Sequence, residues 1–499
     1  MKPHHYLVVA FLAATQFLSA QTIRTGLFDN TLDVGNPAIP GETVYNATSQ
    51  TYSLTGGGLN MWFDKDEFQY AYKKLQGDFI LRADVAFVGE GIDPHRKIGW
   101  TIRPSLSGNG EHVSAVLHGD GLTSLQYRER DGGETMSIDS VGSHAEVIQL
   151  ERRGNLYVMS MAKKGNPLRV LHQIELSLPD DVYAGLFICS HNPEVKETAI
   201  FSNVRIVKPA SAELTPYREY IGSNLEVMDV ETGHRKIIYQ VKNSIQAPNW
   251  TLDGQALIYN SEGNLYRFGL GSGQPEKINL GPVKGNNNDH VLSFDGKVLG
   301  ISANQPSGGG SVIYYSPAEG SDNPIQVTLE SPSYLHGWSP DGKEVIYTAR
   351  RNDVYNLYKK NIVGGKEVKL TDTPGLDDGS EFSPDGKYIY FNSNRTGTMQ
   401  LWRMKPNGKN PEQLTFDEFN DWFPHVSPDG SKIVFLSYLP EVPSGDHPFY
   451  KQVYLRMMDI NGGKPKVIAY LYGGQGSINV PSWSPDSKKV AFISNSVID

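Results

Sequence analysis

The chain has 499 residues, of which 38% are hydrophobic, and its 46 basic and 55 acidic side chains give a formal net charge of −9. These values are typical of a soluble globular protein, argue against a disordered chain, and allow two or three domains. An acidic chain without runs of Lys or Arg offers no electrostatic footprint for nucleic acid. The single cysteine, Cys189, excludes a disulfide scaffold.

The N-terminal residues have the pattern of a cleaved secretory signal. Lys2 precedes the apolar stretch 6–18, and the small residues Ser19 and Ala20 follow it. This stretch is shorter than the about 20 apolar residues that cross a bilayer. We therefore expect residues 1–20 to be a signal peptide, the mature chain to have no transmembrane segment, and the protein to be periplasmic or secreted.

Residues 21–210 are strand-like and contain no long repeat. Apolar and polar residues alternate in segments such as 79–87 and 156–159, and glycine-rich turns separate the segments. A β-sandwich or jelly roll fits a unit of this size. The sequence predicts a linker over 208–212.

Residues 211–499 contain one phrase six times, apolar–Ser/Thr–x–Asp–Gly, with Ser in place of Gly in the last copy. Its aspartates are spaced by about 40 to 60 residues, which is typical of four-stranded propeller blades. The stretch 224–239 before the first copy reads as two strands of an incomplete blade, and the last copy supplies two more. The sequence predicts an all-β fold, a sandwich followed by a six-bladed propeller, with the ring closed by pairing of its first and last strands.

The segments 338–343, 382–387 and 392–397 resemble the repeats of TolB-like six-bladed β-propellers. Segments 98–103 and 185–192 of the front half resemble concanavalin A-like or laminin G-like jelly rolls. Cell-envelope TolB carries a small α/β domain where this chain has the predicted jelly roll, so the resemblance implies the fold and not the docking role of TolB.

The aspartates of the phrase are expected to be structural. Ser or Thr, Asp and Gly together satisfy the backbone groups of a tight turn between two strands. The loops on the opposite propeller face do not have turn formulas. They bring His290, His336 and His425 close to the phrase in three different blades, with His447 in a long loop nearby.

We expect these side chains to surround one axial opening, because propeller blades point their inner strands at a common axis. The histidines with Asp378 and Asp421 are candidate catalytic residues, and the three histidines are candidate ligands of a divalent metal such as Ca, Mn or Zn. Imidazoles that only link neighbouring blades are the alternative. The ligand-binding candidates are Asn288, Asp289, His290, His336, Arg351, Asp377, Asp378, Arg395, Asp421, Trp422, His425 and Asn479.

Two functions remain open from the sequence. In the first, the propeller binds a glycan or an envelope protein at its mouth without catalysis. In the second, it is a polysaccharide-degrading enzyme, because some TolB-like propellers are uronate lyases that hold a metal with histidines; a cation or an arginine would then stabilise the uronate carboxylate while a base removes a proton.

Overall fold

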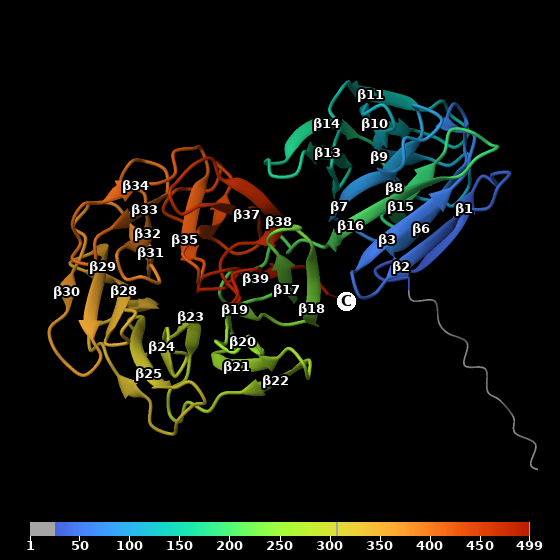
Figure 1. Ribbon diagram of the computed structural model, residues 1–499. Helices are drawn as coiled ribbons and strands as arrows, with labels where there is room; N and C mark the ends of the chain where they lie inside the picture. Colours follow the sequence, from blue (N-terminus) through green and yellow to red (C-terminus); the bar gives the residue numbers. More distant parts are fainter. Residues whose placement is uncertain (1–24, 306–307, 499) are drawn as a thin grey trace, which may run out of the picture.

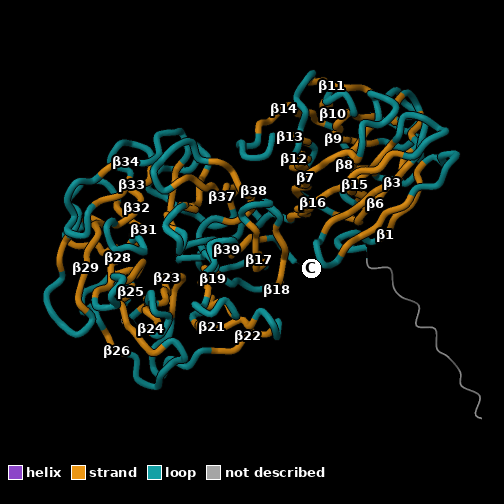
Figure 2. Tube along the Cα trace, viewed as in Figure 1, coloured by secondary structure: helices purple, strands orange, loops and turns teal. Residues whose placement is uncertain are grey.

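The computed structural model describes residues 25–305 and 308–498, and Figure 1 shows two lobes that join where the chain passes from β16 to β17. The predicted signal peptide, residues 1–20, lies outside the described residues. Every regular element of the described part is a β-strand and none is a helix (Figure 2), so the all-β prediction is confirmed. A helix able to span a lipid bilayer is likewise absent from these residues.

The N-terminal lobe contains two seven-stranded antiparallel sheets. The first has the order β1 (Asn30–Val34), β6 (Phe68–Leu75), β15 (Val182–Cys189), β8 (Lys97–Arg103), β9 (His112–His118), β10 (Thr123–Arg128) and β11 (Met136–Ser140). The second has the order β14 (Arg169–Glu175), β13 (Leu156–Ala162), β12 (Val147–Arg153), β7 (Phe79–Val88), β16 (Glu197–Val207), β3 (Thr51–Gly56) and β2 (Glu42–Asn46). A short hairpin adds β4 (Met61–Trp62) and β5 (Lys65–Asp66).

Both sheets contribute to one hydrophobic core. Leu81 and Ala83 of β7 belong to it together with Ile98 and Trp100 of β8, and all four side chains are buried. The apolar positions of these strands are two residues apart, as expected where one face of a strand meets a core. The resemblance to concanavalin A-like jelly rolls stays a prediction.

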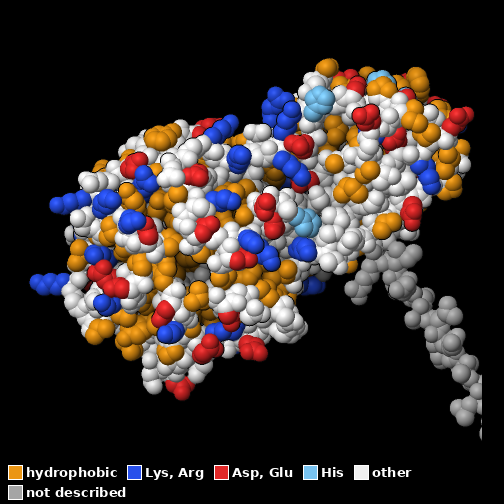
Figure 3. All heavy atoms as spheres, in the orientation of Figure 1, with side chains coloured by type: hydrophobic (Ala, Val, Ile, Leu, Met, Phe, Trp, Pro, Cys, Tyr) orange, Lys and Arg blue, Asp and Glu red, His pale blue; other side chains and the backbone are white. Residues whose placement is uncertain are grey.

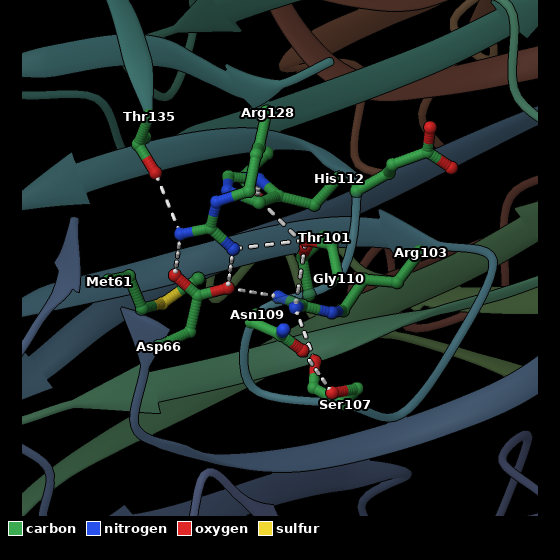
Figure 4. A network of polar contacts seen from close by, with 12 residues as sticks. Met61, Asp66, Thr101, Arg103, Ser107, Asn109, Gly110, His112, Arg128 and Thr135 are labelled. Carbon is green, nitrogen blue, oxygen red and sulfur yellow. Dashed lines mark hydrogen bonds and ion pairs between the residues drawn. The ribbon is translucent and has the colours of Figure 1, made fainter. Parts of the chain in front are cut away.

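The first sheet also buries a network of charges, which Figure 4 shows from close by. The carboxylate of Asp66 accepts hydrogen bonds from Arg103 Nη1 at 2.7 Å and from Arg128 Nη1 and Nη2 at 2.8 Å, and all three side chains are fully buried. Burial raises the pKa of Asp66, but the two arginines outweigh burial and lower it. This network fixes the hairpin β4–β5 against β8 and β10.

The second lobe consists of six sheets arranged around an axis, and this confirms the six-bladed propeller (Figure 1). The four-stranded blades are, from the innermost strand outward, β19 (Gln246–Trp250), β20 (Ala256–Ser261), β21 (Asn264–Gly269) and β22 (Gln274–Lys277); β23 (Asn286–Leu292), β24 (Val298–Asn304), β25 (Ser311–Pro317) and β26 (Ile325–Gln326); β27 (Ser333–Trp338), β28 (Glu344–Arg351), β29 (Val354–Asn361) and β30 (Val368–Lys369); β31 (Asp377–Phe382), β32 (Ile389–Ser393), β33 (Gln400–Met404) and β34 (Glu412–Gln413); and β35 (Asn420–Val426), β36 (Lys432–Tyr438), β37 (Lys451–Asp459) and β38 (Lys466–Gly473).

The sixth sheet combines strands from distant parts of the chain. Its order is β18 (Arg235–Val241), β17 (Ser223–Asp229) and β39 (Lys489–Asn495), with Ser223 opposite Asn495 and Asp229 opposite Lys489. The innermost strand expected before β39 is reduced to one bridge between Trp483 and Val490. The C-terminus therefore lies between the lobes (Figure 1).

A buried polar interface joins the two lobes. Arg205 of β16 forms an ion pair with Glu226 of β17, and Arg235 lies 3.6 Å from the same carboxylate. Gln50 donates to the carbonyl of Ile237 at 2.8 Å and accepts from its amide at 2.9 Å. The ion pair is buried and the bonds of Gln50 are partly buried, and together they resist separation of the lobes. On the face that Figure 3 shows, basic and acidic side chains are intermixed and neither sign forms a large patch.

Candidate functional site at the propeller mouth

The five regular innermost strands share an irregularity that determines which side chains face the axis. Each strand carries a β-bulge near its start, at 246–249, 286–290, 335–337, 378–381 and 422–425. A bulge changes the direction of the side chains that follow it. The bulge of β23 is longer than the others. Asn286 pairs with Ala303 of β24 and His290 pairs with Ile301, so β23 advances four residues while β24 advances two.

A cavity of about 1010 Å³ opens where these strands begin. Its lining mixes amide, aromatic and charged side chains from several blades, from the loop between β36 and β37, and from the segment between β16 and β17. A volume of this size lies at the upper end of the about 300–1,000 Å³ that pockets for small molecules occupy. The cavity is therefore large enough for a ligand of more than one ring.

Two carboxylates and an imidazole occupy the polar side of the cavity. His336 Nε2 of β27 lies 2.8 Å from Asp378 Oδ1 of β31. The same oxygen accepts hydrogen bonds from Thr348 Oγ1 at 2.6 Å and from the Gly379 amide at 2.9 Å. Asp289 of β23 also lines the cavity, and both carboxylates act electrostatically on His336. Three neighbouring blades thus contribute to one group.

The two carboxylates have widely different pKa values. Burial raises the pKa of Asp289 to about 7, since the charge of His336 opposes this effect only partly and Asp378 adds to it. Burial also disfavours the charged form of Asp378, but the charge and hydrogen bond of His336 lower its pKa to about 2. For His336, burial lowers the pKa, and Asp378 outweighs burial and raises it. Near neutral pH the site therefore holds a carboxylate beside a carboxyl group that can gain or lose a proton.

The remaining polar lining is rich in amides. Asn260 Oδ1 and Asn286 Oδ1 are buried without a hydrogen-bond partner among the described residues, as are His336 Nδ1 and His447 Nδ1. All four residues line the cavity, so the wall around these atoms is rich in hydrogen-bonding groups. The amide side chains of the lining are Asn243, Gln246, Asn260, Asn286, Asn287, Asn288, Asn304, Gln475 and Asn479.

Of the residues that the sequence predicts for this mouth, one part lines the cavity: Asn288, Asp289, His336, Asp378 and Asn479. The remaining candidates do not line it: His290, Arg351, Asp377, Arg395, Asp421, Trp422 and His425. The longer bulge of β23 directs Asp289 into the cavity and turns His290 away, although His290 and His336 hold the same position relative to the repeated phrase.

His290 and His425 contact neighbouring blades instead of the cavity. His290 is buried and its Nε2 lies 3.3 Å from the carbonyl oxygen of Ile258. His425 Nδ1 lies 2.7 Å from Glu381 Oε2, and its Nε2 lies 2.7 Å from the carbonyl oxygen of Ile478. Both ring nitrogens of His425 are therefore occupied. The expectation that three imidazoles share one opening is wrong for these two, which link blades.

The charged candidates around the mouth are engaged in the propeller wall. Arg395 Nη2 bonds Asp377 at 2.8 Å, and Arg351 Nη2 bonds Glu367 at 2.8 Å. Asp421 accepts a hydrogen bond from Arg456 Nη2 at 2.5 Å. Trp422 is fully buried, and its ring contacts the ring of His447 with 4.5 Å between centroids. These residues stabilise the wall, and the arginines are not available to a ligand.

The expected metal site has no geometric support. Within the ranges that the structure describes, no three His, Cys, Asp or Glu side chains are placed to hold one ion. The separation of His290 and His425 from His336 explains this, since three protein ligands from different blades would have to converge.

Sequence reasoning missed the side chains at the rim and at the ends of the second strands. Asn260 is the last but one residue of β20 and Asn304 is the last residue of β24, and the two hold different positions relative to the repeated phrase, so the repeat gives no common signal for them. Tyr217 and Tyr220 belong to the segment that follows the predicted linker, and nothing in their local sequence connects them with the propeller. His447, which the sequence predicts near this face, lines the cavity.

Comparisons with known proteins agree with the geometry of the second lobe. A family model of the TolB beta propeller domain matches residues 331–441. An uncharacterized protein from Agrobacterium fabrum is 43% identical over 272 residues, which are 54% of this chain and 92% of that protein. The chain belongs to the TolB-like β-propeller family.

Solved structures extend this result. An Agrobacterium tumefaciens protein assigned as TolB is 41% identical and covers 56% of this chain and 100% of its own, with a TM-score of 0.54. TolB from Acinetobacter baumannii is 20% identical over 51% of this chain and 64% of its own, with a TM-score of 0.41. The similarity to the Agrobacterium structure assigns the propeller fold to this family and leaves the ligand to be argued from the cavity.

Proposed function

We propose that the propeller mouth binds a carbohydrate, and that the protein takes part in the use of an extracellular glycan. The observation that carries this proposal is the lining of a large cavity by amide side chains, such as those of Asn260 and Asn286, together with His336 and His447. Amide and imidazole groups both donate and accept, so they match hydroxyl groups, which do the same. The aromatic side chains of the lining would contact the apolar faces of sugar rings.

The charges of the cavity favour a neutral sugar over an acidic one. Arg351 and Arg395, which the sequence offered as partners of a uronate carboxylate, are held by Glu367 and Asp377. Asp378 keeps a negative charge inside the cavity at neutral pH because its pKa is about 2. An acidic sugar at this place would meet the like charges of Asp378 and of Glu262, which also lines the cavity, and Lys242 is the one lysine or arginine of the described lining.

A second candidate is an enzyme that acts on the bound glycan. The difference between Asp289, with a pKa of about 7, and Asp378, with a pKa of about 2, is the observation that favours it. A pair of carboxyl groups with separated pKa values supplies one group that can donate a proton and one that stabilises positive charge. Asp289 would be the acid or base, with His336 as its neighbour.

A glycan screen tests both candidates. The full mature chain would be titrated by calorimetry with neutral and acidic plant and algal polysaccharides, and new reducing ends would be measured in the same samples. We expect binding of neutral glycans that Asn286→Ala and His336→Ala weaken at least tenfold, while Asp353→Asn, at an exposed position, has no effect. Absence of binding to every glycan contradicts the proposal, and new reducing ends that D289N abolishes establish the enzyme.

We further propose that residues 1–20 direct export and that 21–210 form a concanavalin A-like domain that offers the glycan a second contact. N-terminal sequencing of protein from the periplasm or medium tests the first part. A separate titration of the same glycans with a Y217A/H336A variant, whose mouth is impaired, tests the second: residual binding is expected if the front domain contributes.

A further inference from the structure

Two exposed tyrosines stand at the rim of the cavity, outside the propeller repeats. Tyr217 and Tyr220 lie in the segment between β16 and β17, and 57% and 42% of their surfaces are exposed. Both line the same cavity as Asp289 and His336, which are buried. The cavity therefore has a deep polar part and an open aromatic part.

The tyrosine rings are held in place by contacts from behind. Phe449 meets the ring of Tyr217 edge-on with 5.0 Å between centroids, and the ring of Tyr220 with 5.8 Å. The next residue, Tyr450, accepts a hydrogen bond from the Ile221 amide at 3.2 Å, which fixes the end of the segment. Preset rings lose little freedom when a ligand stacks on them.

The backbone of Tyr217 is in the left-handed region, with φ of +65°. A non-glycine residue rarely adopts this conformation, and an aromatic one is strained there. The segment keeps this conformation through short turns: the Arg218 amide bonds Thr215 O at 3.3 Å and the Thr215 amide bonds Glu219 Oε2 at 2.7 Å. A strained backbone that places the Tyr217 ring at the cavity rim agrees with a functional role for this ring.

We propose that the ligand is a neutral oligosaccharide of at least two sugar units, with one unit in the polar part and the next stacked on Tyr217 and Tyr220. This inference rests on the proposed function and adds the chain length of the ligand and a second subsite. It also assigns a binding role to the segment between the lobes, because that segment supplies both stacking rings.

Chain-length dependence of binding tests the inference. The full mature chain would be titrated with glucose and with glucose tetramers joined by β-1,4, β-1,3 or α-1,4 bonds, and likewise with galactose and mannose and their tetramers. We expect at least one tetramer to bind more than tenfold tighter than its monomer. The Y217A/Y220A double variant should remove this advantage, so that tetramer and monomer bind it with similar affinities.

Two variants serve as controls. Y217F/Y220F keeps both rings and should retain the advantage of the tetramer, since stacking and not the hydroxyl groups carries it. F416A removes another exposed aromatic side chain that does not line the cavity, and it should bind as the unaltered protein does.

The outcomes separate the two proposals. Equal affinities for monomer and tetramer, or a tetramer advantage that survives in Y217A/Y220A, overturn the subsite and leave the proposed function standing. Loss of binding in Y217F/Y220F also overturns stacking. Failure of every sugar to bind the folded protein overturns both proposals.

Discussion

Histidines at similar places in the sequence have different roles in this propeller. His336 lies in the cavity and bonds Asp378, while His425 spans from Glu381 to the carbonyl of Ile478 in another part of the ring. Residue type and position in the repeat were sufficient to select both as candidates. The direction of each ring depends on the bulge of its own strand, which no local pattern reveals.

The blade-linking role of His425 predicts a loss of stability and not of binding alone. His425→Ala leaves the Ile478 carbonyl without this partner and leaves the buried Glu381 carboxylate with the Val426 amide in place of two partners, so we expect the free energy of unfolding to fall by about 3 kcal/mol. Urea unfolding measures this change. His144→Ala, at an exposed position, is the control, and an unchanged stability of H425A contradicts the assignment.

Asp289 predicts a pH dependence of stability. Its pKa is about 7 in the folded protein, above the usual value of about 4, so folding takes up a proton between these values. The contribution of Asp289 to stability is fully present below pH 4 and is lost as the pH rises through 7. D289N has no carboxyl group to ionise at this position, so its stability does not fall in this pH range for this reason. At pH 8 it should be more stable than the unaltered protein by up to about 4 kcal/mol.

Melting temperatures of both proteins from pH 5 to pH 8 check this prediction. The difference in favour of D289N should grow with pH, whereas a constant difference shows that Asp289 does not titrate in this range. D353N, which changes an exposed carboxylate, should follow the unaltered protein throughout.

At the scale of elements, the repeated phrase forms the same turn in each copy. In the copy at 338–342, Ser339 Oγ donates to Asp341 Oδ1 at 2.7 Å and accepts from the Glu344 amide at 2.9 Å, and Gly342 has a φ of +68°. The structural interpretation of these residues agrees with this geometry, since the polar groups are satisfied within the turn. The phrase was decisive for the fold because turn chemistry is local.

Removal of one such hydroxyl should therefore cost stability without affecting the mouth. Ser339→Ala leaves the Glu344 amide without its acceptor, and we expect a decrease of about 1–2 kcal/mol in the free energy of unfolding. Chemical unfolding and a sugar titration measure both properties. Ser272→Ala, in an exposed turn, should change neither, and a loss of binding in S339A would contradict the separation of turn and site.

At the scale of the whole molecule, the interface between the lobes holds the segment that carries Tyr217 and Tyr220. Glu226 of β17 is fully buried, with Arg205 of the front lobe and Ser494 of β39 bonded to it. Burial raises the pKa of Glu226, but the two arginines beside it outweigh burial and lower the pKa to about 2. One carboxylate thus connects the front lobe with both ends of the propeller chain.

Loss of this carboxylate should loosen the junction. Glu226→Ala leaves Arg205 and Arg235 buried without their partner, which costs about 3–5 kcal/mol, and we expect faster proteolysis within 208–222. Limited proteolysis with mass spectrometry locates the cut. Glu197→Ala breaks the buried ion pair with Arg96 inside the front lobe and should not speed this cleavage; equal rates in both variants would contradict the junction role.

The sequence by itself determined the all-β class, the number of blades and the place of the site residues near one end of the ring, because turns and strand alternation depend on neighbours in the chain. Tertiary structure alone decided which of these side chains enter the cavity. His290 and His425 turn away at bulges, Arg351 and Arg395 pair with carboxylates of their own blades, and Tyr217 and Tyr220 arrive from outside the repeats. The direction of a side chain at a bulge and the contacts between distant segments depend on packing over the whole ring, which a short stretch of sequence does not encode.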